Sequence, residues 1–143
     1  MMLQPAVIMG GKHEDKRGIV SFINDFDMSP VKRFYTIYHP DTTVIRAWQG
    51  HQIEQKWFVV LEGSFEIALV NPDNWIAPSP RLPVQLFKLS AAVSQVLHIP
   101  GGYASGFKAI APHSRMIVYS NLSLQESADD DFRFDQQLWH TWQ

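Results

Sequence analysis

The chain has 143 residues, of which 45% are hydrophobic and 18% are charged, and its formal net charge at pH 7 is -2. This length and composition predict one soluble globular domain over residues 1–143 and exclude a disordered chain. The charge provides no basic field for nucleic acid, and no apolar run approaches the roughly 18 residues of a membrane-spanning helix.

Residue types that are absent narrow the chemistry further. The chain contains no cysteine, which excludes disulfides, thiolate catalysis and cysteine metal sites. Residues 1–11 show no charged leader followed by a long apolar stretch, so a secretory signal is not expected. Both observations favour a cytoplasmic location.

Short runs of β-branched and aromatic residues, separated by Pro, Gly, Asn and Asp, dominate the chain and are typical of strands. In chain order, these runs predict strands at Gly18–Ile23, Val31–Tyr38, Val44–Trp48, Gln55–Leu61, Ser64–Val70, Val84–Leu89, Gln95–Ile99, Ser105–Ile110 and Arg115–Asn121. Glu62-Gly63, between two of the runs, indicates a tight hairpin. The proline-rich segment 71–83 predicts a long loop, placed to cover the mouth of a barrel.

The C-terminal tail carries the main evidence for a helix. The acidic run 129–131 is interpreted as a solvated cap, and Phe134, Leu138 and Trp142 repeat at helical spacing after it. A short turn is expected near Ala91. Many short strands with almost no helix predict an all-β sandwich, jelly roll or closed barrel.

The strand that leads into residue 51 is the most informative segment. If the chain stays extended there, Gln49 and His51 point to one face, because side chains alternate along a strand. The small apolar residues Ile45 and Ala47 share that face. This order is typical either of a strand that runs from packed core into a wet cavity or of a strand end with two polar side chains in solvent.

The strand near residues 31–38 places an arginine among apolar side chains. Arg33 and Tyr35 share a face with Val31 and Ile37. A guanidinium on an apolar face needs an anionic partner. That partner is either a bound phosphate or an internal Glu or Asp.

These segments and several others resemble the cupin superfamily, and more narrowly the branch that contains dTDP-4-keto-6-deoxyglucose 3,4-ketoisomerases and dTDP-4-dehydrorhamnose 3,5-epimerases. The resemblance implies a single all-β domain, a cupin-type jelly-roll barrel with a short C-terminal tail or helix. The similar stretches are Arg17-Gly18 and residues 32–37 for the ketoisomerases, and residues 55–60 before Gly63, 89–91, 97–107 and 133–135 with Trp142 for the epimerases.

The resemblance also implies that the metal site of other cupins is missing. Metal-binding cupins supply three histidines and a glutamate as ligands, and only His51 is retained among them. Lys56 brings a positive charge to one of the other positions, which disfavours a cation. We therefore expect no catalytic metal and no cofactor. The four matching positions are Gln49, His51, Lys56 and Ser105.

The chain resembles the ketoisomerases more closely than the epimerases. The epimerases carry their catalytic histidine at the position of Gln49, and an amide cannot act as a general base near neutral pH. Their tyrosine acid has no counterpart in residues 120–125. The ketoisomerases carry a histidine at the position of His51 and a strand tyrosine at the position of Tyr35.

The activity implied by this resemblance is proton transfer on a nucleotide-linked 4-keto sugar through an enolate. His51 is the expected base, since imidazole titrates near ~6.5, and Tyr35 is expected to donate to the enolate oxygen. The expected substrate-binding residues are Gln49 and Lys56 for the carbonyl or ring hydroxyls, Arg33 and Arg46 for the pyrophosphate, and Ser105 and Tyr119 facing the cavity.

Two classes of function stay open. One is an isomerase or epimerase acting on a dTDP- or UDP-linked 4-keto-6-deoxyhexose, and the other is a catalytically inactive cupin that binds a sugar nucleotide. The expected partner is a nucleotide-linked sugar, with no nucleic acid and no membrane, and the resemblance implies a homodimer. Trp48, Trp57 and Tyr103 either stack on the ligand or pack in the core. His39, before Pro40, is expected in a turn.

Overall fold

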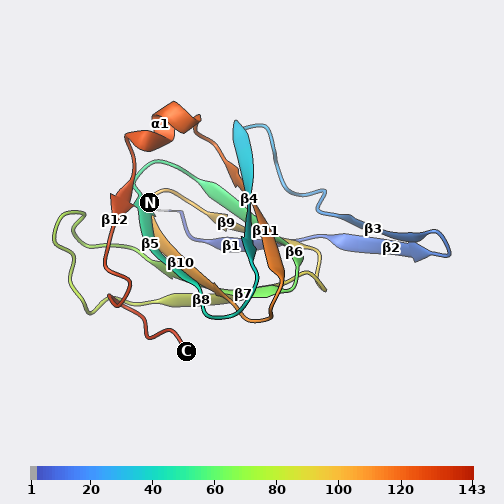
Figure 1. The fold of residues 1–143 in the computed structure, drawn as a ribbon. Helices are drawn as coiled ribbons and strands as arrows, with labels where there is room; N and C mark the ends of the chain where they lie inside the picture. Colours follow the sequence, from blue (N-terminus) through green and yellow to red (C-terminus); the bar gives the residue numbers. More distant parts are fainter. Residues whose placement is uncertain (1–2) are drawn as a thin grey trace.

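The computed structural model describes residues 3–143, which form two five-stranded antiparallel sheets and a separate two-stranded hairpin. The first sheet has the strand order β1-β9-β6-β11-β4 and the second has the order β12-β5-β10-β7-β8. In Figure 1 the two sheets enclose a common interior, with one short helix at one end. The elements are β1 (Ala6–Met9), β2 (Gly11–Asp15), β3 (Gly18–Phe22), β4 (Arg33–His39), β5 (Ile45–His51), β6 (Lys56–Glu62), β7 (Ser64–Val70), β8 (Gln85–Ser90), β9 (Gln95–Ile99), β10 (Tyr103–Ala109), β11 (Ser114–Ser120), α1 (Leu124–Ala128) and β12 (Phe132–Arg133).

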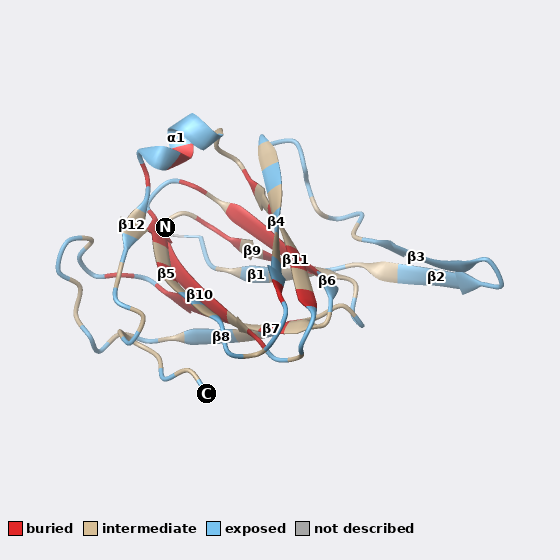
Figure 2. Cartoon of the chain, viewed as in Figure 1, coloured by how far each residue is buried: buried red, intermediate tan, exposed pale blue. Residues whose placement is uncertain are grey.

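The core lies between the two sheets, as the period-two pattern of the strands requires. On β11, Met116 and Val118 are fully buried, whereas their neighbours Arg115 and Ile117 are partly exposed. Figure 2 shows buried segments on the strands of both sheets and exposure along the projecting hairpin. The prediction of an all-β barrel is confirmed. The largest fully buried core side chains include Phe58, Phe65, Ile67, Leu69, Leu97 and Met116.

The turn at Glu62-Gly63 differs from its prediction. Gly63 adopts φ 69 there, a conformation that favours glycine. However, β6 pairs with β9 and β11, whereas β7 pairs with β8 and β10. The turn therefore carries the chain from one sheet to the other and does not close a hairpin.

The N-terminal segment contains two strands that the sequence pattern did not predict. β1 pairs with β9 at the edge of the first sheet, and β2 pairs with the predicted strand β3. The β2–β3 hairpin projects away from the barrel (Figure 1), and its residues are almost all exposed. Short, charged β2 (GKHED) lacks the apolar alternation that marks the other strands.

The predicted helix over the tail is wrong. The only helix in residues 3–143, α1, ends before the tail begins, and Trp139 has φ 71, which an α-helix does not allow. Phe134, Leu138 and Trp142 instead pack with Trp48 on the second sheet. The apolar spacing of the tail therefore reflects packing on a sheet. No helix in the described residues is long and apolar enough to cross a membrane.

Candidate active site

A cavity of about 1050 Å³ lies between the two sheets, on the side where β4 and β5 face each other. It is lined by side chains from both sheets, from α1 and from β12. No residue of the loop 71–83 lines it, so that loop does not cover this opening. Six of the eight site residues expected from the sequence line the cavity. These six are Arg33, Tyr35, Arg46, Gln49, Lys56 and Ser105.

Strand alternation and register bring these residues together. On β4, Arg33 and Tyr35 are partly buried, whereas Phe34 between them is exposed. On the opposite sheet Gln49 of β5 is paired with Ser105 of β10. The predicted alternation is confirmed on β4, whereas on β5 the cavity is lined by Arg46 and Trp48 as well as Gln49, and not by His51.

Lys56 is a buried cation that has no carboxylate partner. Its side chain is 5% exposed, and Nζ donates a hydrogen bond to Oε1 of Gln49 at 3.3 Å. Gln49 in turn donates from Nε2 to Asp131 at 3.1 Å. No Asp or Glu oxygen of residues 3–143 lies within 4.0 Å of the Lys56 amine. A desolvated ammonium without a counter-ion favours an anionic group in the adjoining space.

Two cations lie close to the ring of Tyr35. The Lys56 Nζ is 5.8 Å from its centroid and the Arg33 Cζ is 5.3 Å away. Positive charge near the ring favours negative charge that develops on an oxygen close to this tyrosine.

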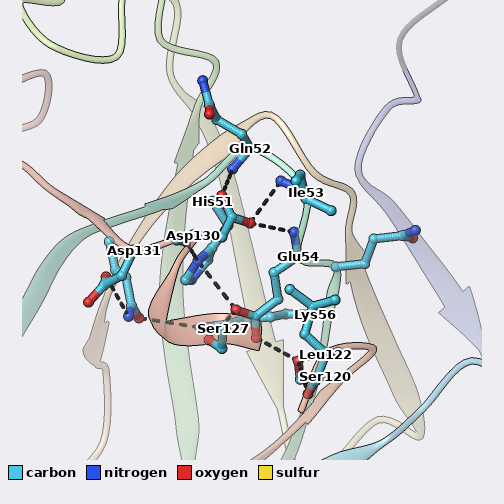
Figure 3. Close-up of polar contacts among 12 residues, drawn as sticks. His51, Gln52, Ile53, Glu54, Lys56, Ser120, Leu122, Ser127, Asp130 and Asp131 are labelled. Carbon is cyan, nitrogen blue, oxygen red and sulfur yellow. Dashed lines mark hydrogen bonds and ion pairs between the residues drawn. The ribbon is translucent and has the colours of Figure 1, made fainter. Parts of the chain in front are cut away.

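His51 lies beside the cavity and is not one of the residues that line it. The side chain is buried, and Nδ1 is 2.6 Å from the carbonyl oxygen of Asp130 (Figure 3). Since a carbonyl can only accept, Nδ1 carries the hydrogen, and Nε2 is left with its lone pair and no partner. Burial, and then the charge of Lys56, lower the pKa of His51 from its ordinary value. The ring is therefore a neutral imidazole with a free basic nitrogen.

Glu54 contacts several other residues of this region, and the sequence pattern does not predict this role. It is almost fully buried and accepts hydrogen bonds from Ser120 Oγ at 2.5 Å and Ser127 Oγ at 2.6 Å. It also accepts from Arg33 Nη2 at 3.2 Å, and its Oε1 is 3.4 Å from His51 Nδ1. The anionic partner of Arg33 is thus an internal carboxylate. Glu54 is thus the acidic neighbour of His51.

Asp130 corrects the interpretation of the acidic run as a solvated cap. Its carboxylate is buried and accepts from the backbone N–H groups of Gln52, Ile53 and Glu54, at 2.8, 2.8 and 2.7 Å. Its carbonyl also accepts from His51. One residue thus fixes both the turn after β5 and the imidazole (Figure 3). Nothing in the local sequence separates Asp130 from its exposed neighbour Asp129.

Arg46 lines the cavity and donates from Nε to Nε2 of His39 at 3.0 Å. His39 is the last residue of β4 and is fully buried, so its expected placement in a turn is wrong. The strand continues one residue further than its pattern predicts, because the ring packs against Phe65 and Phe107.

The structure places Tyr119 away from the cavity, contrary to expectation. On β11 the inward residues are Val118 and Ser120, and the ring of Tyr119 packs against Phe26 and Phe34 at centroid distances of 5.4 and 6.3 Å. A side chain on the odd positions of this strand faces outward.

Of the three aromatic residues considered as stacking platforms, Trp48 lines the cavity, whereas Trp57 and Tyr103 do not. Trp57 stacks on His98, with ring centroids 4.9 Å apart, and Tyr103 belongs to the core. Trp48 touches the cavity but also packs against the tail residues Trp139 and Trp142. Within residues 3–143 no group of three or more His, Asp or Glu side chains converges as metal ligands would.

Neither the scan against protein-family models nor the search of curated proteins finds a match to this chain. Solved structures are similar at low identity. A mutant of a 3,4-ketoisomerase from Thermoanaerobacterium thermosaccharolyticum, in complex with TDP-4-keto-6-deoxyglucose, is 22% identical with a TM-score of 0.71, covering 94% of this chain and 90% of that chain. The dTDP-4-dehydrorhamnose 3,5-epimerase of Bacillus anthracis str. Ames, with TDP and PPi bound, is 19% identical with a TM-score of 0.76, covering 96% and 84%. The fold is that of the dTDP-sugar ketoisomerases and epimerases.

A third similar structure, a 3,4-ketoisomerase from Helicobacter canadensis, is 16% identical with a TM-score of 0.73 and covers 96% of both chains. The similarity to this group therefore extends over nearly the whole chain. The prediction of a cupin-type jelly-roll fold is confirmed.

Proposed function

We propose that the protein is a sugar-nucleotide isomerase or epimerase that acts on a dTDP- or UDP-linked 4-keto-6-deoxyhexose by proton transfer through an enolate. The observation that carries the proposal is the imidazole of His51, held neutral with a free Nε2 beside a cavity that contains Lys56 and Tyr35. The likeness in fold to enzymes whose structures hold TDP or a TDP-linked keto sugar supports the same class of substrate.

The chemistry starts at a carbon next to the keto group, where the C–H bond is weakly acidic. Nε2 of His51 takes the proton from C3, and the electron pair moves onto the C4 oxygen to give the enolate. The positive charge of Lys56 stabilises that oxygen, and the hydroxyl of Tyr35 is the proposed donor to it. Return of a proton to the opposite face of C3 restores the C4 ketone and gives the epimer. Protonation of the C4 oxygen and of C4, with loss of the C3 hydroxyl proton, moves the ketone to C3.

The nucleotide end of the substrate needs a cation at the mouth of the cavity. Arg46 fits this role, because its guanidinium has no carboxylate partner in the described chain and a planar fork matches phosphate oxygens. Arg33 is already engaged by Glu54, so we assign it mainly to holding that carboxylate and, with it, the surroundings of His51.

A second candidate function is an inactive cupin that only binds a sugar nucleotide. The specific observation in its favour is that His51 is 5% exposed and does not line the cavity. The base therefore reaches a substrate in the cavity only if the side chains that separate the ring from the cavity move aside.

Hydrogen exchange at the sugar carbons separates the two candidates. The protein is incubated with dTDP-4-keto-6-deoxyglucose in heavy water, and the C3 and C5 protons are followed by NMR. Washout at C3 alone supports ketoisomerisation or 3-epimerisation, and washout at both carbons supports 3,5-epimerisation. Binding without exchange indicates the inactive cupin, and absence of binding contradicts both proposals.

Two substitutions test the assignment of the base. His51→Asn should abolish exchange while TDP still binds, because the amide can still donate to the Asp130 carbonyl from near the position of Nδ1 but lacks a basic nitrogen. Gln49→Ala should mainly weaken substrate binding. The opposite ranking of the two variants in exchange rate would contradict the role given to His51.

We also propose that the protein is a cytoplasmic homodimer, as the resemblance implies. The β2–β3 hairpin exposes Ile19, Val20 and Phe22, and an isolated two-stranded hairpin is only marginally stable in water. A second copy packed on this hairpin would cover these side chains. Sedimentation equilibrium tests the proposal, and a monomer at micromolar concentration would contradict it.

A further inference from the structure

Arg46 is a cation of the cavity whose one side-chain hydrogen bond in the described residues goes to a neutral group, His39. Its side chain is exposed and lines the cavity, and Nε donates to Nε2 of His39 at 3.0 Å. Its terminal Nη groups make no hydrogen bond to the described protein, and no carboxylate of residues 3–143 lies within 4.0 Å. The two nitrogens best suited to a phosphate are therefore left free.

His39 is fixed in place more firmly than the arginine it holds. It is 0% exposed, and its ring lies 5.3 Å from the centroid of Phe65 and 5.9 Å from that of Phe107. A guanidinium can only donate, so the lone pair is on Nε2 and the hydrogen is on Nδ1. That Nδ1–H is buried without a partner.

An unsatisfied buried N–H destabilises the fold, so stability alone does not account for a histidine at this position. A leucine or phenylalanine would fill the space between the two aromatic rings without leaving a polar atom unpaired. What the histidine supplies, and an apolar side chain does not, is the acceptor for Arg46.

We infer that His39 is a positioning residue, which holds the guanidinium of Arg46 so that its two Nη groups face the cavity and bind the diphosphate of a nucleotide-linked ligand. This inference rests on the proposed function for the class of ligand. Burial, and then the charge of Arg46, lower the pKa of His39, so the ring remains an acceptor at neutral pH. The charged neighbours of His39 are Arg46 on β5 and Asp41 in the following loop; the rings from β7 and β10 are uncharged.

A matched pair of amide variants tests the inference. The side chain of glutamine reaches the position of the histidine Nε2, whereas that of asparagine ends near Nδ1. His39→Asn should therefore weaken TDP binding about tenfold, as the loss of a charge-assisted hydrogen bond predicts. His39→Gln should bind within about threefold of the unsubstituted protein. Calorimetric titration with TDP measures both, and thermal melts show that each variant is folded.

Kinetic constants separate positioning from general damage. If exchange at the sugar occurs, His39→Asn should raise KM and leave kcat nearly unchanged, because Arg46 contacts the diphosphate in the ground state and the transition state alike. Arg46→Met should give the same loss of TDP affinity, and the double variant no further loss. Equal affinities for the Gln and Asn variants, or additive losses in the double variant, would overturn the inference.

Failure of the proposed function gives a different result from failure of this inference. If unsubstituted protein does not bind TDP, the ligand class is wrong. If it binds TDP, and Arg46→Met but neither amide variant weakens binding, only the role of His39 is wrong. Should both amide variants fail to fold, ¹⁵N NMR of the unsubstituted protein decides, since the inference requires the Nδ1–H tautomer of His39 and a shift of the Arg46 Nε–H signal on adding TDP.

Discussion

Replacing Asp130 with alanine should destabilise the protein more than any change at a neighbouring acidic residue. The carboxylate accepts three backbone N–H groups at 2.7–2.8 Å, and a hydrogen bond to a charged group contributes about 1.5–3 kcal/mol. Gln52 and Ile53 are exposed, so water can satisfy their N–H groups, whereas the N–H of Glu54 is buried. We therefore expect a loss of about 3–5 kcal/mol in the free energy of unfolding, less than the simple sum.

Urea denaturation followed by tryptophan fluorescence measures this loss directly. The melting temperature should fall by roughly 6–20 °C, since 1 kcal/mol corresponds to about 2–4 °C for a domain of this size. Asp129→Ala is the matched control, because Asp129 is exposed and its carboxylate accepts no hydrogen bond in the described residues. It should change stability by less than about 0.5 kcal/mol. Equal stabilities for the two variants would refute the role assigned to the carboxylate.

Two further predictions concern protons. Lys56 lowers the pKa of His51, and Glu54 raises it. Lys56→Met should therefore move the acid limb of the kcat/KM profile to higher pH, and Glu54→Gln should move it to lower pH. Shifts of both variants in the same direction would contradict these assigned effects. Burial lowers the pKa of His39, His51 and His98, so in the pH range just below ~6.5 the unfolded chain binds more protons than the folded one. The free energy of unfolding should therefore fall between pH 7 and pH 5, before the carboxylates titrate, and a flat profile in urea denaturation would show that these rings are not held neutral.

The strand series was predictable because an interior between two sheets imposes a period of two on each strand that borders it. β4 and β11 carry this period clearly. β2 does not, because it projects into solvent and no face of it is buried. The helical spacing of Phe134, Leu138 and Trp142 predicts a helix over the tail, although each of them packs against the outside of a sheet. Spacing alone does not identify the partner surface.

Site residues on regular strands were predictable from the sequence. Site residues that are held by contacts between distant parts of the chain were not. Gln49 on β5 and Lys56 on β6 occupy strand positions that the resemblance to cupins assigns to the site. The roles of Glu54 and Asp130 depend on a turn whose backbone is held by a residue 76 to 78 positions away in the sequence. His39 was placed in a turn because proline follows it, yet its ring ends the strand inside the core. Such contacts follow from tertiary structure and leave no local pattern.

The cavity has a mechanical consequence, because β4 and β5 face each other across it and form no hydrogen-bonded ladder with one another in residues 3–143. Away from the loop 40–44 that joins the two strands, side chains set the separation of the sheets at this seam, so it can widen or narrow without breaking a backbone ladder. A molecule held by Arg46 on one side and Tyr35 on the other would bridge the seam and set its width. The barrel would then be stiffest when it is occupied.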